Sequence, residues 1–156
     1  MPIEIERKYR VLNLHWQNYV SAKFEIHQGY ISTSPSQTIR VRCSGSSAWI
    51  TLKGKARHGK RLEYEYSIPV DDALEMLEKW CSNTRIHKTR HHVMVGNHLW
   101  EVDVFHGENN GLIIAEVELN SIDETFIEPE WVDKEVTDDH RYSNSSLSLN
   151  PFKNWS

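Results

Sequence analysis

Pairs of like charges spaced two residues apart recur along this chain. The first pair, Glu4 and Glu6, is followed at the same spacing by Lys8. Further pairs of both signs follow: Arg40 and Arg42, Glu63 and Glu65, Lys88 and Arg90, Glu101 and Asp103 (both acidic), and Glu116 and Glu118. Residues two apart in a β-strand point to the same face of the sheet. The pattern therefore predicts a sheet with one charged surface, to which most of its strands contribute.

Alternating apolar and polar residues predict a run of antiparallel strands with few interruptions. We expect them at residues 3–11, 24–32, 37–43, 48–53, 61–68, 84–95, 98–106 and 112–119. Gly96-Asn97 is a favoured tight turn, so the two strands around it form a hairpin. Two short helices are expected, one at 14–22 and one around 140–147. No internal repeat or low-complexity linker interrupts the chain, which predicts a single domain over residues 1–156.

A third helix of about ten residues is expected to begin near Pro69-Val70 and to end near Cys81. Asp71 or Asp72 has the side chain of a typical N-cap residue. Leu74, Leu77 and Trp80 follow helical spacing and are predicted to form the buried face of this helix. Trp131, in the C-terminal part, is also predicted to lie in the core.

The composition is that of a globular protein, with 26% charged and 38% hydrophobic residues. The net charge of -4 argues against a broad nucleic-acid-binding surface, which is normally basic. The N-terminus has no apolar signal region, and no apolar run reaches the ~18–20 residues of a membrane span. Cys43 and Cys81 form no Cys-x-x-Cys pattern, and we interpret them as reduced thiols of a cytoplasmic protein.

A charged face needs an explanation beyond solvent exposure. Any antiparallel sheet with one wet face alternates polar and apolar residues, and that is the ordinary interpretation of a single pair. Two like charges ~5 Å apart, however, repel by roughly 3 kcal/mol at an effective dielectric near 20, and this chain separates acid pairs from base pairs. Closing the strands into a barrel with these faces inward would make a charged tunnel. Because unpaired buried charges cost several kcal/mol each, its lumen must hold water or a ligand.

The two kinds of charge indicate two kinds of ligand. Clustered arginine and lysine side chains suit a polyanion with several phosphate oxygens. Clustered carboxylates suit Mg²⁺ or Mn²⁺, hard cations that prefer oxygen ligands and often bridge phosphates. Together they predict a metal-dependent phosphoryl-transfer site. The histidines predict no metal site, because His91 and His92 are adjacent in a strand and no His-x-x-x-His spacing occurs. Tyr30 and Trp49 are expected to pack rather than to bind substrate.

The order of these motifs resembles the CYTH superfamily, the triphosphate tunnel metalloenzymes. The similarity starts with Glu4-x-Glu6-x-Lys8 and extends along nearly the whole chain. The other matching segments are Ile39-Arg40-Val41-Arg42, Thr51-Leu52-Lys53-Gly54, Arg61-x-Glu63-x-Glu65, Lys88-x-Arg90, Glu101-Val102-Asp103, Glu116-x-Glu118 and the tail from Glu135-Val136-Thr137 to Asn144. The resemblance implies an α+β fold, an eight-stranded antiparallel β-barrel that forms a closed tunnel flanked by a few helices.

The resemblance also implies roles for individual residues. Glu4, Glu6 and Glu118 would hold the metal, Mg²⁺ or Mn²⁺. The triphosphate would be bound by Lys8, Arg40, Arg42, Lys53, Lys88 and Arg90. We group as catalytic Glu4, Glu6, Lys8, Lys88, Glu63, Glu65, Asp103 and Glu116. The last four have open roles: orienting a cation, binding a second metal, positioning water, or forming structural ion pairs. Arg61 and Glu101 share the charged face but are weaker candidates.

The favoured activity is hydrolysis of a small triphosphate, with inorganic tripolyphosphate as the leading substrate. The alternatives are a class IV adenylyl cyclase, a thiamine triphosphatase, an RNA triphosphatase and a non-catalytic triphosphate or nucleotide-binding module. Only Met1-Pro2-Ile3 precede the first motif, so the His-Phe pair of some similar cyclases is absent. The extra helical segments of larger thiamine triphosphatases are also absent. Barrels of this family can pair through their outer faces, so a homodimer is a further expectation, and no membrane partner is expected.

Overall fold

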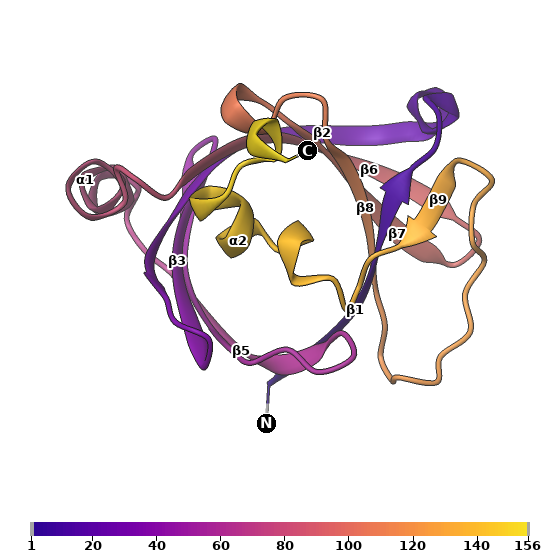
Figure 1. The fold of residues 1–156 in the computed structure, drawn as a ribbon, viewed down its shortest axis with the longest axis horizontal. Coiled ribbons are helices and arrows are strands. Elements are labelled where there is room, and N and C mark those ends of the chain that lie inside the picture. Colours follow the sequence, from indigo (N-terminus) through magenta and orange to yellow (C-terminus); the bar gives the residue numbers. More distant parts are fainter. Residues whose placement is uncertain (1, 156) are drawn as a thin grey trace.

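Eight antiparallel strands close into a barrel in the computed structural model, which describes residues 2–155 (Figure 1). The strands are β1 (Ile3–Val11), β2 (Val20–Thr33), β3 (Gln37–Ser44), β4 (Ser47–Gly54), β5 (Lys60–Ser67), β6 (Arg85–Val95), β7 (His98–Phe105) and β8 (Ile113–Glu118). Their order around the barrel is β5-β4-β3-β2-β6-β7-β8-β1, and pairing of β1 with β5 closes it. A ninth strand, β9 (Val132–Glu135), pairs with the end of β1. The barrel predicted by the resemblance is thus confirmed.

The barrel has its charged face inside and most of its apolar face outside. Outward-facing Ile5, Tyr9, Val93 and Trp100 pack in the largest hydrophobic cluster, which also includes Trp16. Trp16 belongs to η1 (His15–Tyr19), a 3-10 helix that lies against β6. The main hydrophobic core therefore lies between the barrel wall and the segments that cover it, so the lumen is available for polar side chains.

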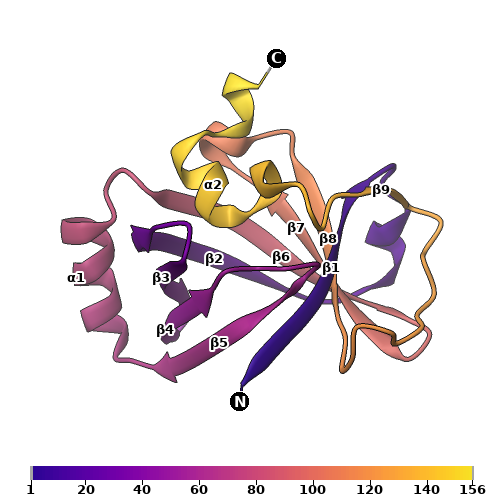
Figure 2. The same ribbon diagram turned by 60° about the horizontal axis from the view of Figure 1, so that its bottom comes forward.

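A second cluster fills one end of the lumen. Inward-facing Tyr30, Ile86 and Phe105 pack there against Tyr142 and Leu147 of the C-terminal segment. That segment contains η3 (His140–Tyr142), α2 (Asn144–Leu149) and η4 (Phe152–Asn154), and Figures 1 and 2 show α2 lying over one opening of the barrel. The Ser143 hydroxyl caps α2 by accepting from the Ser146 amide at 3.2 Å. The C-terminal helix was expected in this region but starts later than residue 140.

The helix α1 (Val70–Trp80) forms as expected on the outer side of the barrel (Figure 1). Its buried face was predicted correctly at Leu77, which is 1% exposed, and wrongly at Leu74 and Trp80, which are 52% and 62% exposed. Ala73 and the following Cys81 are buried together with Leu77, and the three pack against Val41 and the neighbouring strand residues. Residues 73, 77 and 81 lie four apart and form an alternative apolar stripe with smaller side chains, which can approach the barrel more closely.

Two further expectations differ from the structure, and one strand was not predicted. The N-cap of α1 is Pro69, without a capping side chain, while Asp71 and Asp72 lie in the first turn, where carboxylates favour the helix dipole. The helix expected at 14–22 is the shorter η1, because the chain is already extended from Val20. The strand β9 was not predicted.

Trp131, at 3% exposure, is in the core as predicted, and both cysteines are buried and free. Among the described residues no helix has the length and apolarity to cross a membrane.

Candidate active site

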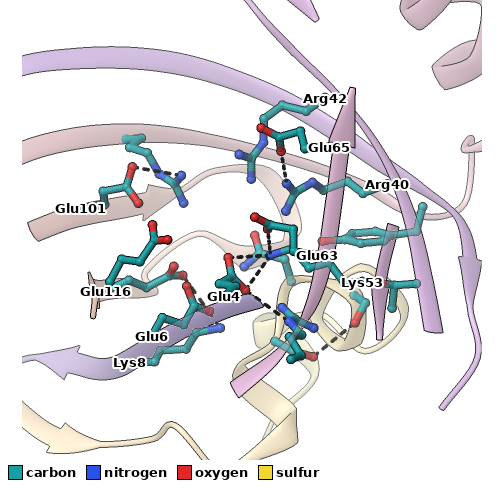
Figure 3. Close-up of a pocket in the computed structure, with 18 of the residues that line it drawn as sticks. Glu4, Glu6, Lys8, Arg40, Arg42, Lys53, Glu63, Glu65, Glu101 and Glu116 are labelled. Atoms are coloured by element: carbon teal, nitrogen blue, oxygen red, sulfur yellow. Dashed lines mark hydrogen bonds and ion pairs between the residues drawn. The ribbon is translucent and has the colours of Figure 1, made fainter. Parts of the chain in front are cut away.

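The inward-facing side chains line a cavity of about 260 Å³ within the barrel (Figure 3). Nearly all residues predicted for the site meet there: Glu4, Glu6, Lys8, Arg40, Arg42, Lys53, Glu63, Glu65, Lys88, Arg90, Glu116 and Glu118, together with Arg61 and Glu101. Asp103 is the exception. It points inward from β7 but is fully buried behind Lys88 and Arg90. The period-two pattern therefore identified the lining, and only burial could separate Asp103 from it.

Three carboxylates from β1 and β8 form the acidic part of the cavity. Glu6 and Glu118 are direct partners across the two strands, and Glu4 lies two residues before Glu6 on the same face. Glu4 accepts from Lys53 Nζ at 3.2 Å and from Arg61 Nε at 3.3 Å. Glu4 is therefore balanced by two cations, whereas no ion pair joins Glu6 or Glu118 to a cation within residues 2–155.

The pKa values of these carboxyls follow from their burial and from this imbalance in ion pairing. Burial raises the pKa of Glu6 to about 8, with further contributions from the charges of Glu116 and Glu4. The pKa of Glu118 is also raised, by burial and by Glu4 and Glu63. For Glu4 burial acts in the same direction, but Lys53 and Arg61 outweigh it and lower the pKa to about 2. The cavity thus holds more negative charge around Glu6 than its own cations neutralise.

Two arginines from β3 form the opposite, basic wall. Arg40 donates to Thr51 Oγ1 at 3.3 Å and lies 3.6 Å from Glu65, but its buried Nε has no hydrogen-bond partner. Arg42 Nε donates to Gln28 Oε1 at 2.8 Å and, within the described chain, has no ion-pair partner. Burial lowers the pKa of Arg42 to about 9, and the charges of Arg40 and Arg90 add to this effect. Two neighbouring guanidinium groups whose hydrogen-bond donors are only partly taken up by protein acceptors form a site for an anion with several oxygens.

Asp103 holds the two cations of β6. Lys88 Nζ donates to Asp103 Oδ2 at 2.8 Å, and Arg90 grips the same carboxylate through Nε at 2.8 Å and Nη2 at 2.9 Å. Burial raises the pKa of Asp103, but Arg90 and Lys88 outweigh it and hold that pKa well below its ordinary range. The geometry makes Asp103 a positioning residue, which fixes Lys88 and Arg90 so that they face the cavity.

Two more ion pairs connect the acidic and basic sides. Lys53 lies 3.2 Å from both Glu4 and Glu63, and Lys8 Nζ lies 3.8 Å from Glu116. Burial raises the pKa of Glu116, but Lys8 and Arg90 reverse this and lower it to about 2, so the carboxylate is ionised. These pairs explain how so many charges tolerate burial, since every acidic residue that lines the cavity, except Glu6 and Glu118, has a cation beside it.

Polar residues that were not predicted from the sequence complete the lining. Ser143, Asn144 and Ser145 reach the cavity from the C-terminal segment. Asn144 Oδ1 accepts from Lys88 Nζ at 3.0 Å and from Gln28 Nε2 at 3.2 Å, so it links this segment to the barrel wall. Tyr30 packs in the end cluster, as expected, but also lines the cavity. Single polar residues on a helix or at a strand end leave no periodic signal, so the sequence pattern did not reveal them.

Comparison with known proteins agrees with this geometry. The model of the CYTH domain matches residues 2–149. The chain belongs to the CYTH domain family. An inorganic triphosphatase of Acetivibrio thermocellus is 41% identical over 97% of both chains, and one of Nitrosomonas europaea is 36% identical over 94% of this chain and 97% of its own. A solved structure of an inorganic triphosphatase, 36% identical, superposes with a TM-score of 0.68 over 96% of each chain.

The cavity of this CYTH domain protein has a donor set that fits a hard divalent cation. Glu6 and Glu118 are direct partners on neighbouring strands, and burial together with the charges of neighbouring carboxylates raises the pKa of both. A divalent cation would relieve that repulsion with the oxygen ligands it prefers. Glu4 lies beside them but is engaged by Lys53 and Arg61, so it would exchange part of these ion pairs for the metal. The residues present therefore fit the predicted metal.

Proposed function

We propose that this chain hydrolyses inorganic tripolyphosphate in the cavity of its barrel, with Mg²⁺ or Mn²⁺ as cofactor. The observation that carries the proposal is the separation of charge. Arg42 on β3, which has no ion-pair partner among the described residues, and Arg40, whose Nε has no hydrogen-bond partner, line the same cavity as Glu6 and Glu118, which no described cation pairs with. The two relatives named as inorganic triphosphatases support it at 41% and 36% identity. In this arrangement a polyphosphate chain lies between the cations, while its metal lies at the carboxylates.

The size of the cavity favours a small substrate. Its volume of about 260 Å³ is slightly below that of typical ligand pockets, which range over ~300–1,000 Å³. A linear triphosphate fills such a space without the volume that a nucleoside would need. The lining is also almost wholly charged or hydroxylated, with Tyr30 as its one aromatic side chain among the described lining residues. A base or a thiazole ring would find little apolar surface there.

The cations bind and orient the substrate. Arg40 and Arg42 present guanidinium groups with free donors, and the Arg90 guanidinium is fixed by Asp103. Lys8, Lys53 and Lys88 add three ammonium groups around the same space. Holding phosphoryl groups in line and neutralising the charge that develops on the leaving phosphate is the main task in phosphoryl transfer. These six side chains can perform that task without covalent chemistry.

The carboxylates hold the metal and the attacking water. Glu4, Glu6 and Glu118 are the proposed ligands, and the bound cation supplies Lewis-acid polarisation of a phosphoryl oxygen. Glu63 and Glu65, from β5, line the cavity close to Lys53 and Arg40, where either carboxylate can accept a hydrogen bond from water. Glu116 keeps Lys8 in place, and Asp103 keeps Lys88 and Arg90 in place.

The proposal is tested by phosphate release from tripolyphosphate with Mg²⁺ and with EDTA, in the wild type and in Glu4→Gln. We expect metal-dependent release by the wild type and its loss in Glu4→Gln, with an unchanged circular dichroism spectrum. The matched control is Glu108→Gln, which removes an exposed carboxylate paired only with Lys153 at 2.7 Å. Full activity in Glu4→Gln would refute the metal assignment, and metal-independent release by the wild type would refute the mechanism.

A further inference from the structure

A second cluster of metal-ligating side chains lies on the outer face of the barrel. Glu25 on β2, His87 on β6 and His106, which follows β7, each offer one ligand atom, and these atoms all lie within 4.8 Å of one another. Among residues 2–155 they form the one such group of three or more. The strand alternation that turns Lys88 into the lumen turns His87 outward, so this cluster lies on the opposite side of the wall from the cavity.

Strand pairing builds this cluster from three separate parts of the chain. His27 is the direct cross-strand partner of His87, and Glu25 that of Thr89. The amide of His106 donates to the carbonyl of His87 at 3.0 Å, which places the third imidazole on the other side of β6. Three histidines therefore form a row across adjacent strands, with ring centroids 4.2 Å and 4.7 Å apart.

The cluster is partly preorganised. Glu25 accepts from His87 Nε2 at 2.8 Å and from the Thr89 hydroxyl at 2.6 Å. Thr89 has only one hydroxyl proton, so His106 Nε2, 2.7 Å away, donates to it. The His27 ring stacks on His87 at an angle of 12° and limits its rotation. The Nε2 atoms of both ligand histidines thus already converge on the Glu25–Thr89 pair.

We propose that Glu25, His87 and His106 form a binding site for a transition-metal cation of the Zn²⁺ class. Two imidazoles and one carboxylate are a donor set that suits Zn²⁺, Ni²⁺ or Cu²⁺, whereas Mg²⁺ prefers oxygen alone. Zn–N bonds of 2.0–2.1 Å require tetrahedral ligand atoms about 3.3 Å apart, which small side-chain rotations from the present spacing provide. Both imidazoles bind as neutral rings, with their protons moved to Nδ1.

The surroundings leave the fourth position open. The cluster borders a surface cavity of about 550 Å³, whose lining includes His27, His87 and His106 and also Leu147 and Ser148 of α2. Water or a further side chain can complete the coordination from this cavity. Because the ligands come from β2, β6 and the residue that follows β7, a bound metal joins three parts of the wall and stabilises the folded state, by an amount that grows with the logarithm of its concentration relative to its Kd.

Isothermal titration of the full chain with ZnCl₂, in excess Mg²⁺ to occupy the cavity carboxylates, tests the site. We expect one Zn²⁺ per chain in the wild type, and a loss of at least about 100-fold in affinity in His87→Gln/His106→Gln, since even loss of a supporting partner costs 10–100-fold. His15→Gln is the matched control. It removes a surface histidine whose Nδ1 also lies 2.7 Å from a glutamate, Glu130. Among residues 2–155, His15 and Glu130 belong to no group of three or more potential metal ligands.

Equal Zn²⁺ affinity in the wild type and the double variant would overturn the proposal. Zn²⁺ binding that persists in the double variant and is lost in Glu4→Gln would also overturn it. A second measurement does not depend on the variant's folding. In the wild type, paramagnetic Ni²⁺ should broaden the imidazole NMR signals of His87 and His106 and leave that of His15 sharp. Broadening of all histidine signals alike, or of none, would contradict the site.

Discussion

Asp103→Asn should be among the most destabilising substitutions in the barrel, although it preserves the size of the side chain. Asp103 is fully buried and accepts from Lys88 at 2.8 Å and from Arg90 at 2.8 and 2.9 Å. The amide removes the negative charge but leaves both cations in place. Breaking a buried ion pair by removing one partner costs about 3–5 kcal/mol, and here two cations lose their partner. We therefore expect a loss of about 4 kcal/mol, a large part of the 5–15 kcal/mol that typically stabilises a domain.

Urea unfolding at pH 7, followed by tryptophan fluorescence, measures this loss. Glu101→Gln is the matched control, because Glu101 is partly exposed and pairs with Arg90 at 3.3 Å and with His92 at 3.5 Å. We expect it to cost about 0–1 kcal/mol, as partly exposed pairs do. The pKa of Asp103 lies well below its ordinary range, so its stabilisation is present above about pH 4 and is lost as the pH falls further. An Asp103→Asn protein within 1 kcal/mol of the wild type at pH 7 would refute this account of the ion pairs.

Three further predictions concern the basic wall, the acidic group and the outer helix. Arg42→Gln should raise the KM for tripolyphosphate about 10- to 100-fold in steady-state assays, since a hydrogen bond to a charged group is worth about 1.5–3 kcal/mol. The free energy of unfolding should not fall, because burial and neighbouring cations already disfavour the charged form of Arg42 and lower its pKa to about 9. In EDTA the free energy of unfolding should decrease as the pH rises from 4.5 to about 8, by up to about 1.4 kcal/mol per pH unit. The reason is that Glu6, with its pKa raised to about 8, keeps a proton that the unfolded chain releases. Glu6→Gln should remove this slope, and an unchanged slope in the variant would contradict the assignment. In urea unfolding, Leu77→Ala should lower the free energy of unfolding by about 2–5 kcal/mol, whereas Trp80→Ala should change it by no more than about 0.5 kcal/mol. This is the reverse of what residue size alone suggests, because Leu77 is buried and Trp80 is 62% exposed.

The inner face of the barrel was predictable because it depends only on strand alternation. Glu4 and Glu6, or Arg40 and Arg42, have to share a face wherever their strand is placed, and the like-charge repulsion indicated that this face is not plain solvent-exposed surface. The closed eight-stranded barrel was implied by the resemblance, since the alternation is the same for an open sheet, and the order of the strands was not predicted. The homodimer stays a prediction, which light scattering of the purified chain would check.

The features that were missed depend on partners distant in sequence. Asp103 has the same spacing as its neighbours, but its burial follows from the two cations that cross over it. Trp80 lies on a helix with two apolar stripes, and only the distance between the helix and the barrel decides which one packs. The outer cluster of Glu25, His87 and His106 joins three strands, so no local spacing could indicate it. Asn144 likewise acquires its role only when the C-terminal segment lies over the barrel.

A comparison of two substrates in one experiment with the wild-type chain tests most directly whether the barrel cavity hydrolyses a small linear triphosphate. Phosphate release is measured from tripolyphosphate and from ATP at equal concentration with Mg²⁺, and the ATP reactions are also analysed for cyclic AMP. The charged cavity of about 260 Å³ predicts a much larger kcat/KM for tripolyphosphate and no cyclic AMP. Equal or faster turnover of ATP, or accumulation of cyclic AMP, would contradict the assignment of this cavity to a small linear triphosphate.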